Sequence, residues 1–170
     1  FRASPIRNAI SSTSFTRCKM VTELKTTKIW ELLNNIPDPE IPIISIVDLG
    51  VVRDVGHEEN QLTITITPTY SGCPAISFIK EEIKRNLELE GFESIQINTS
   101  LSPPWTTDWM NDETRKKLKE AGIAPPEKYV GCPQCNSRHV DIISEFGSTA
   151  CKAMYKCVDC FETFEYFKCI

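Results

Sequence analysis

The 170-residue sequence is poor in the residues that common catalytic sites require. It contains only 2 histidines and 7 glycines, and neither His57 nor His139 lies in a pattern that defines a Cys–His catalytic pair. The glycines do not match the spacing of a phosphate-binding loop. The sequence therefore offers no nucleophilic dyad and no nucleotide-binding motif on which to base an enzyme assignment.

A long hydrophobic run and an excess of basic charge are also missing. The richest apolar stretch, residues 41–52, is interrupted by proline, serine, aspartate and glycine, whereas about 18 uninterrupted apolar residues are needed to span a bilayer. The formal net charge is −4, and the segment after residue 19 is more acidic still, because the first 19 residues carry four basic side chains and no acidic one. We expect no membrane span and no nucleic-acid partner, since phosphate binding needs clustered Lys and Arg.

Residues 1–19 differ in composition from the rest of the chain. They are rich in Arg and Ser, as organellar transit peptides are, but an amphipathic pattern begins directly after Met20. We expect residues 1–19 to be a disordered extension upstream of a natural start at Met20, with a targeting role as the alternative. Eight cysteines without a secretory signal favour a reducing compartment, and we expect a cytoplasmic protein.

The pattern of residues 20–100 predicts a small α+β domain. Apolar residues recur at helical spacing in two segments, and β-branched or alternating residues mark the strands between and after them. Prolines end the first helix and Gly91 ends the second. The α-β-β-α-β order predicts one compact layer of strands and helices. In chain order, the predicted elements are a helix over 26–36, one or two strands within 43–55, a strand over 61–67, a helix over 74–90 and a strand over 93–99.

Residues 101–129 are predicted to link this domain to a second module. A stiff Pro/Trp arm begins at Ser102, and a polar helix follows over residues 108–121. Trp105 and Trp109 lie four residues apart, so both can press on the same neighbour. We interpret them as staples that hold the linker to the first domain, with a ligand contact as the alternative.

Residues 130–170 contain two C-x-x-C pairs with 21 residues between them. Each pair at a tight turn directs two sulfurs into one space, and two facing pairs make the tetrahedral thiolate set that Zn²⁺ accepts in a closed structural site. A hairpin and a third strand at 161–167 would bring the pairs together, and a core this small needs the metal to fold. We predict a β zinc ribbon, with iron or paired disulfides as alternatives. The predicted ligands are Cys132, Cys135, Cys157 and Cys160.

Cys73 is the candidate functional residue of the first domain. It directly precedes Pro74 at the predicted start of the long helix, where unpaired amides and the helix dipole favour a thiolate. We therefore expect a lowered pKa and a thiol that acts as a nucleophile or soft-metal ligand. An inert buried cysteine is the alternative.

The remaining candidates have open roles. Asp38 and Glu40 flank a proline before the first predicted strand, where they either cap a turn or contribute ligands near Cys73. Cys151 and Cys169 lie close to the ribbon without completing a C-x-x-C pair. Each is a small core residue, an additional thiol ligand or a partner of Cys73, and a thiol oxidoreductase that pairs them is a weaker hypothesis.

Several segments of the sequence match a known family. Those of the first domain resemble the metal–sulfur cluster assembly domain of SufT-like and cytosolic iron–sulfur assembly proteins; they are Asp38-Pro-Glu-Ile-Pro42, Ile46–Asp54 and Thr67-Pro-Thr-Tyr-Ser-Gly-Cys-Pro74. With the segments that follow, the chain resembles the PaaD family of phenylacetyl-CoA epoxidase systems; these are Ser102–Trp109, Gly122–Pro126, the four-cysteine ribbon, Glu145–Lys152 and Phe167–Ile170.

The resemblance implies an accessory protein of aerobic phenylacetate degradation rather than the oxygenase itself. It implies maturation of an iron or iron–sulfur centre in the oxygenase or its reductase, and these components as partners. A non-catalytic structural subunit is the alternative, and a homodimer stays open. The resemblance also implies that Cys73 transiently holds iron or a cluster, that the ribbon cysteines hold zinc or iron, and that four residues line the Cys73 loop, namely Asp38, Glu40, Thr67 and Thr69.

Overall fold

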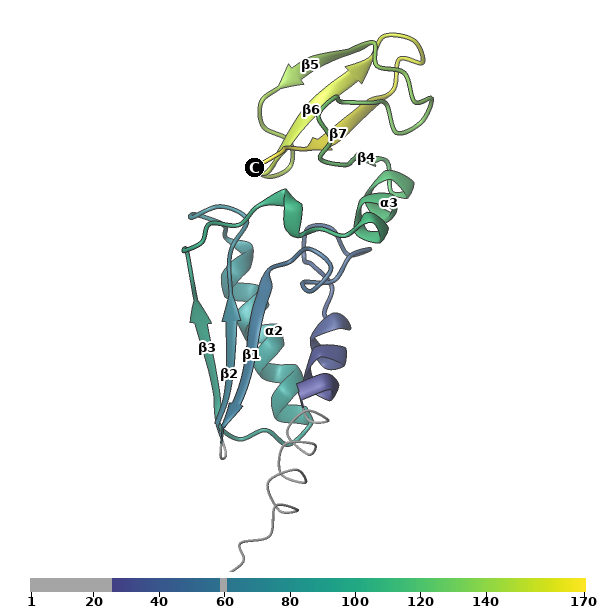
Figure 1. Ribbon diagram of the computed structural model, residues 1–170. Coiled ribbons are helices and arrows are strands. Elements are labelled where there is room, and N and C mark those ends of the chain that lie inside the picture. Colours follow the sequence, from purple (N-terminus) through teal and green to yellow (C-terminus); the bar gives the residue numbers. More distant parts are fainter. Residues whose placement is uncertain (1–25, 59–60) are drawn as a thin grey trace, which may run out of the picture.

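The computed structural model describes residues 26–58 and 61–170. The predictions for the extension at 1–19 and for a natural start at Met20 lie outside the described residues. Two sheets, joined by a connector that carries a short helix, are stacked end to end, with the C-terminus between them (Figure 1). The predicted α+β fold with a C-terminal ribbon is confirmed. No helix within the described ranges combines the length and the apolar character that crossing a membrane requires.

The first module is built on a three-stranded sheet with the order β1-β2-β3. Strands β1 (Val52–Glu58) and β2 (Gln61–Ile66) pair antiparallel, whereas β3 (Ile95–Thr99) pairs parallel with β2. Parallel neighbours need a crossover, and helix α2 (Ala75–Leu89) supplies it. A first helix, described over residues 26–34, lies with α2 on the same side of the sheet (Figure 1). The predicted order of elements is confirmed for the described residues.

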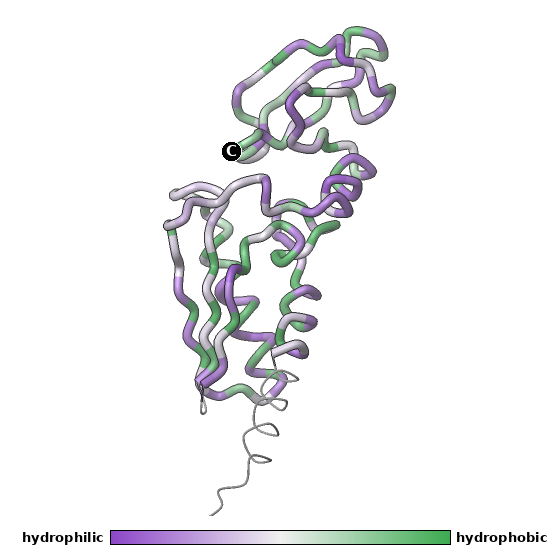
Figure 2. The backbone as a smooth tube through the Cα atoms, viewed as in Figure 1, coloured by the Kyte–Doolittle hydropathy of each residue, from purple (hydrophilic) through white to green (hydrophobic). Residues whose placement is uncertain are grey.

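The core of this module lies between the sheet and the helices (Figure 2). Strand β2 buries alternate residues, as expected for a strand with one covered face. Helix α2 buries one stripe spaced by four residues, which is its face toward the sheet. Burying each such side chain stabilises the fold by about 1.5–3 kcal/mol. The six residues, each at most 2% exposed, are Leu62, Ile64, Ile66, Ile79, Ile83 and Leu87.

The segment before β1 differs from its prediction. Residues 43–50 form turns, and the strand begins only at Val52, so the predicted strand over 43–55 is wrong in its first part. The Asp48 amide donates to Ser45 Oγ at 2.9 Å, and the Ser45 amide donates to Asp48 Oδ2 at 3.2 Å. These local bonds offer the backbone an alternative to strand pairing. Gly50, with φ +73°, then turns the chain into β1.

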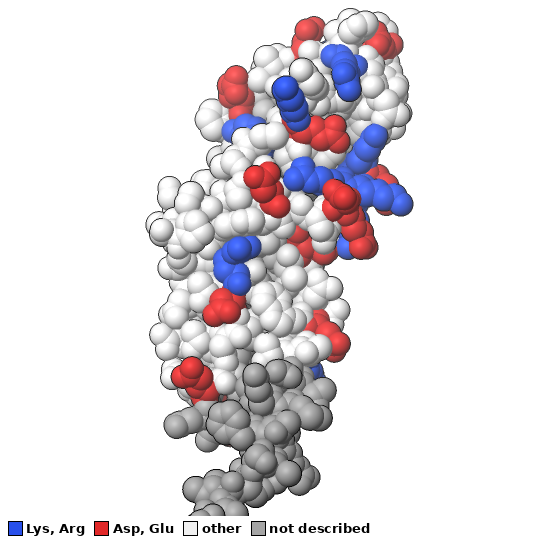
Figure 3. Space-filling model, in the orientation of Figure 1, with Lys and Arg blue, Asp and Glu red and all other residues white. Residues whose placement is uncertain are grey.

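The connector contains two short helices instead of the single helix predicted over 108–121. A 3-10 turn η1 (Thr107–Trp109) is separated from helix α3 (Asp112–Glu120) by Asn111, whose side chain accepts from the Thr114 amide at 2.7 Å. An N-cap of this kind starts a new helix. Acidic residues in the first turn of α3 and basic residues in its last turn complement the helix dipole, and both signs intermingle there on the face in Figure 3.

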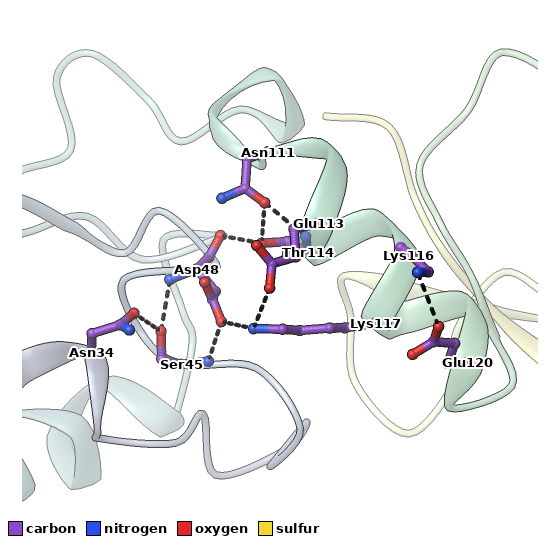
Figure 4. Close-up of polar contacts among 9 residues, drawn as sticks. All are labelled: Asn34, Ser45, Asp48, Asn111, Glu113, Thr114, Lys116, Lys117 and Glu120. Carbon is purple, nitrogen blue, oxygen red and sulfur yellow. Dashed lines mark hydrogen bonds and ion pairs between the residues drawn. The ribbon is translucent and has the colours of Figure 1, made fainter.

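Helix α3 is held against the turn before β1 by a polar network (Figure 4). Lys117 Nζ lies 2.9 Å from Asp48 Oδ2, and Thr114 Oγ1 donates to the Asp48 carbonyl at 3.2 Å. The hydrogen bond to Asp48 raises the pKa of Lys117. Asp48 therefore orders its own turn through Ser45 and anchors the connector at the same time.

Both connector tryptophans contact the first module, as the staple interpretation predicted, but they press on different neighbours. Trp105 is buried, donates from Nε1 to the Leu49 carbonyl at 3.0 Å and packs its ring against Phe167 of the second module, with centroids 5.9 Å apart. The Arg53 guanidinium lies 3.4 Å above the Trp109 ring. Both rings thus make structural contacts.

The second module is a four-stranded sheet with the order β4-β7-β6-β5. The antiparallel strands β5 (Val140–Ser144), β6 (Lys152–Cys157) and β7 (Thr163–Phe167) correspond to the predicted hairpin and third strand. Strand β4 (Ile123–Ala124) comes from the connector and pairs parallel with β7. Two residues carry no periodic pattern, so β4 was not predicted.

Candidate functional site

The four ribbon cysteines converge at one end of the second sheet. Their sulfur atoms all lie within 4.8 Å of one another, and two pairs across the turns, Cys132–Cys160 and Cys135–Cys157, are each separated by 3.6 Å. A disulfide would require about 2.05 Å, so the paired-disulfide alternative does not describe this arrangement. A Zn–S bond of about 2.3 Å gives sulfur–sulfur edges of about 3.8 Å in a tetrahedron. The donor set therefore fits zinc.

The two C-x-x-C turns share one backbone design. The amide of the first cysteine in each turn donates to a carbonyl five residues further on, from Cys132 to Ser137 and from Cys157 to Glu162, each at 2.8 Å. The residue directly after each second cysteine has a positive φ, +59° at Asn136 and +63° at Phe161. A positive φ at a phenylalanine costs about 1–2 kcal/mol, which the surrounding turn must offset.

Side-chain contacts and amides prepare the ribbon cysteines for a metal. Ser137 and His139 both contact the Asp159 carboxylate, which ties the first turn to the second. The backbone amide of Cys160 hydrogen-bonds the Cys157 sulfur and lowers the pKa of Cys157 to about 7. Despite the Glu162 amide, burial and the other cysteine sulfurs raise the pKa of Cys160 to about 12. A metal that binds the four sulfurs therefore has to displace some of their protons.

A second site lies where the two modules meet. A cavity of about 20 Å³ is lined by two thiols, two carboxylates, Thr69, Phe167 and six aliphatic residues of the first module. Cys73 and the two acids come from the first module, whereas Cys151 comes from the turn before β6. The four groups that could bind an ion there are Asp38, Glu40, Cys73 and Cys151.

The predicted acidity of Cys73 is wrong. Helix α2 begins at Ala75 with Pro74 as its N-cap, so Cys73 precedes the cap by one residue. Burial raises the pKa of Cys73 above its ordinary value, and the negative charge of Glu40 raises it further. Hydrogen bonds from the Ala75 amide and Thr69 lower the pKa only in part. The sulfur is therefore a half-buried thiol.

The two carboxylates lie in one tight turn above Cys73. Asp38 Oδ1 accepts from the amides of Glu40 and Ile41 at 3.0 and 2.9 Å, so Asp38 caps this turn as one interpretation of the sequence proposed. Burial raises the pKa of Asp38, and burial together with Asp38 raises the pKa of Glu40. Asp38 therefore caps the turn, and both carboxylates line the cavity beside Cys73.

Two other predicted residues, Thr67 and Cys169, do not line this cavity. Thr67 is buried, and its amide donates to the Val51 carbonyl at 2.8 Å. Cys169 is exposed, and its sulfur contacts the Tyr166 hydroxyl and the Glu127 carbonyl at 3.2 and 3.5 Å. Only Cys151, of the two unassigned cysteines, joins Cys73.

Sequence reasoning missed two residues that support Cys151. Thr149 Oγ1 lies 3.0 Å from the Cys151 sulfur, and Lys152, only 2% exposed, pairs with Glu165 at 2.7 Å. The Thr149 hydroxyl and the Lys152 ammonium lie beside Cys151 in the folded turn before β6, which is packed on the first module. No local pattern distinguishes a buried lysine from the exposed ones around it.

Two family descriptions match the chain. The iron-sulfur cluster assembly protein family matches residues 26–99, and the PaaD zinc beta ribbon domain matches residues 118–168. The first match contains Asp38, Glu40 and Cys73, and the second contains the ribbon cysteines and Cys151. Both candidate sites therefore lie within recognised family domains.

Individual relatives agree with this division. A protein of Escherichia coli (strain K12), provisionally named as the D component of 1,2-phenylacetyl-CoA epoxidase, is 49% identical over 84% of this chain and 92% of its own length. The Fe-S protein maturation auxiliary factor YitW of Bacillus subtilis (strain 168) is 40% identical over 49% of this chain and 82% of its own length. A Bacillus anthracis crystal structure of a domain of unknown function, DUF59, is 32% identical with a TM-score of 0.55, covering 59% of this chain and 96% of that one.

Proposed function

Because the chain belongs to the PaaD family of phenylacetyl-CoA epoxidase components, we propose that it is a non-catalytic accessory factor that matures a metal centre of a phenylacetyl-CoA epoxidase system. The observation that carries the proposal is a half-buried thiol, Cys73, in a cavity with two carboxylates, within a module that matches an iron–sulfur cluster assembly family. The names of shorter relatives as maturation auxiliary factors support the same role. The client centre is an iron or iron–sulfur centre of the oxygenase or its reductase.

The site supports holding and releasing metal more than it supports a reaction. The raised pKa of Cys73 keeps the thiol protonated until a metal binds. The metal-free protein therefore does not present the thiolate that a nucleophilic reaction requires. Cys73 and the two carboxylates would hold iron as cargo, which passes to the client, while the ribbon cysteines would keep zinc as a structural ion.

The test is the metal content of client proteins produced with and without Cys73. The oxygenase and reductase components would be co-expressed with the wild-type chain, with Cys73→Ser and with the control Cys169→Ser, whose sulfur is exposed and outside the cavity. We expect iron per client to fall at least about fivefold with Cys73→Ser and to stay unchanged with Cys169→Ser. Full iron occupancy with Cys73→Ser would refute the proposal.

A structural subunit is the second candidate, because the E. coli relative is named as a subunit. Under that function the chain would co-purify at fixed stoichiometry with the active oxygenase. Clients with full iron content in the absence of the chain, together with an oxygenase that falls apart without it, would favour this candidate over maturation.

A further inference from the structure

The ribbon module contributes to the core of the first module. Cys151 and Phe167, which are 5% and 1% exposed, belong to the same hydrophobic cluster as α2 and β2. The four ribbon cysteines belong to a separate, smaller cluster or to the surface. Cys151 is therefore a ribbon residue by sequence and a first-module residue by packing.

The turn that carries Cys151 is tightly held. The Lys152 amide donates to the Thr149 carbonyl at 3.1 Å, and the Lys168 amide donates to the Cys151 carbonyl at 3.0 Å. The Thr149 hydroxyl contacts the Cys151 sulfur at 3.0 Å. Backbone and side-chain bonds thus position the thiol beside the Cys73 cavity from both sides of the turn.

An ion pair between the buried Lys152 and the half-buried Glu165 also holds this turn. Lys152 Nζ lies 2.7 Å from Glu165 Oε2, and the Ser148 amide donates to Glu165 Oε1 at 2.5 Å. A Cβ on Gly147 would come within 2.7 Å of Glu165 Oε1, so glycine lets the turn approach the pair closely. The positive charge of Lys152 also favours the ionised forms of Asp38 and Glu40.

The cavity has the size and donors for one soft divalent ion. About 20 Å³ is room for about one water-sized group, which is the size of a single ion. Two thiols favour iron and similar metals over magnesium or calcium. Among described residues, only the ribbon cysteines bring three or more such ligand atoms within 4.8 Å of one another. The ligand atoms around the cavity are therefore farther apart in this structure than the four ribbon sulfurs.

We propose that Cys73 and Cys151 together hold a single ferrous ion as cargo, so that the ribbon module supplies one of the two sulfur ligands of the transfer site. This inference rests on the proposed function and names the ion and the second ligand. Two S–H bonds break, two metal–sulfur bonds form and two protons go to solvent, with no change of oxidation state. Exchanging two protons for a divalent cation leaves the charge of the cavity unchanged, which avoids the cost of burying a net charge.

The test measures Co²⁺, an optical substitute for Fe²⁺, binding under nitrogen to the full chain with zinc already in the ribbon. Thiolate-to-cobalt charge-transfer absorption grows with the number of coordinated sulfurs. We expect one cobalt per chain in the wild type, with zinc retained by elemental analysis. Cys73→Ser and Cys151→Ser should each lose about half of this absorption or more, and Cys169→Ser should match the wild type.

The pH dependence gives a readout that a structural role for Cys151 would not change. Two protons released per ion make the apparent affinity fall about 100-fold for each unit by which the pH is lowered while both thiols are protonated. Release of one proton makes it fall about 10-fold per unit. We expect the steeper slope in the wild type and the shallower one in Cys151→Ser. The neighbouring groups are the same in both proteins, so they cancel in the comparison; they are Asp38, Glu40, Tyr70 and Lys152.

A direct proton count in the wild type needs no variant, so it applies even if Cys151→Ser does not fold. Release of two protons per cobalt supports the proposal, whereas release of one, or an unchanged spectrum in Cys151→Ser, overturns it. Client iron that depends on Cys73 but not on Cys151 would leave the proposed function intact and reject the two-thiol site alone. A Cys73–Cys151 disulfide in air without metal binding under nitrogen would also overturn it.

Discussion

At the scale of single residues, the surroundings of each sulfur decide its chemistry. Cys157 receives a backbone hydrogen bond that lowers its pKa to about 7, whereas burial raises the pKa of Cys73 and of Cys151. Adjacency to a proline at a helix start suggested an acidic Cys73, but the helix starts one residue later than this argument needs. These shifts follow from the burial and hydrogen bonds of each sulfur, and they differ within the ribbon itself, because the pKa of Cys160 is raised to about 12.

Gly50 is a residue whose substitution should reveal how the connector is packed. Its φ is +73°, and an added Cβ would lie 3.0 Å from the Trp109 Cβ. We expect Gly50→Ala to lower the free energy of unfolding by about 2–4 kcal/mol, combining the left-handed backbone cost with overpacking. Urea unfolding of the zinc-loaded chain measures this.

The matched control for that substitution is Gly91→Ala. Gly91 has a similar φ, +88°, but an added Cβ would meet nothing within 4 Å. We expect Gly91→Ala to lower the free energy of unfolding by only the cost of the left-handed backbone conformation, about 1–2 kcal/mol. Equal losses of unfolding free energy in the two variants would show that close packing against Trp109 adds nothing to the cost of Gly50→Ala.

At the scale of elements, strong periodicity predicted structure well and short segments escaped it. Helix α2 and strand β2 each present one apolar face over several turns or alternations, and both formed where expected. The residues before β1 have strand-like composition, but Ser45 and Asp48 satisfy the backbone locally. Strand β4 exists only because β7 offers a partner. Long patterns thus carry their own information, whereas short elements depend on their neighbours.

The start of α3 offers a test of the connector as an element. Asn111→Ala removes the side chain that accepts from the Thr114 amide and contacts the Thr114 hydroxyl. We expect a loss of about 1 kcal/mol in the free energy of unfolding, the usual cost of an N-cap. The control Lys116→Ala, on an exposed ion pair of the same helix, should change stability by less than about 0.5 kcal/mol. A loss no larger than that of the control would show that the cap does not stabilise α3.

At the scale of the whole molecule, the two modules share packing and backbone contacts. The Thr107 amide donates to the Ile170 carbonyl at 3.2 Å, and Trp105 lies against Phe167. Cys151 and Phe167 complete the core of the first module. Folding of the ribbon therefore contributes to the cavity around Cys73.

Zinc removal tests this dependence. A structural zinc contributes about 10 kcal/mol or more to a small zinc module, so its loss should unfold the ribbon. Because Trp105 is only 3% exposed and packs on Phe167, we expect tryptophan emission to shift to longer wavelength. Labelling of Cys73 by a thiol reagent should also become faster, since a wall of its cavity is lost. Cys132→Ser without chelator should reproduce both changes, and unchanged emission after complete zinc loss would contradict the shared core.

The sequence by itself determined the features that depend on local spacing. Two C-x-x-C pairs define the ribbon ligands, hydrophobic periodicity defines the α-β-β-α-β order, and the loop before α2 identifies Cys73. Only the tertiary structure decided that Cys151 lies with Cys73, that Cys169 does not, and that burial raises the pKa of both cavity thiols. The reason is physical: desolvation and the meeting of distant side chains arise when two modules pack, and no spacing along the chain encodes them.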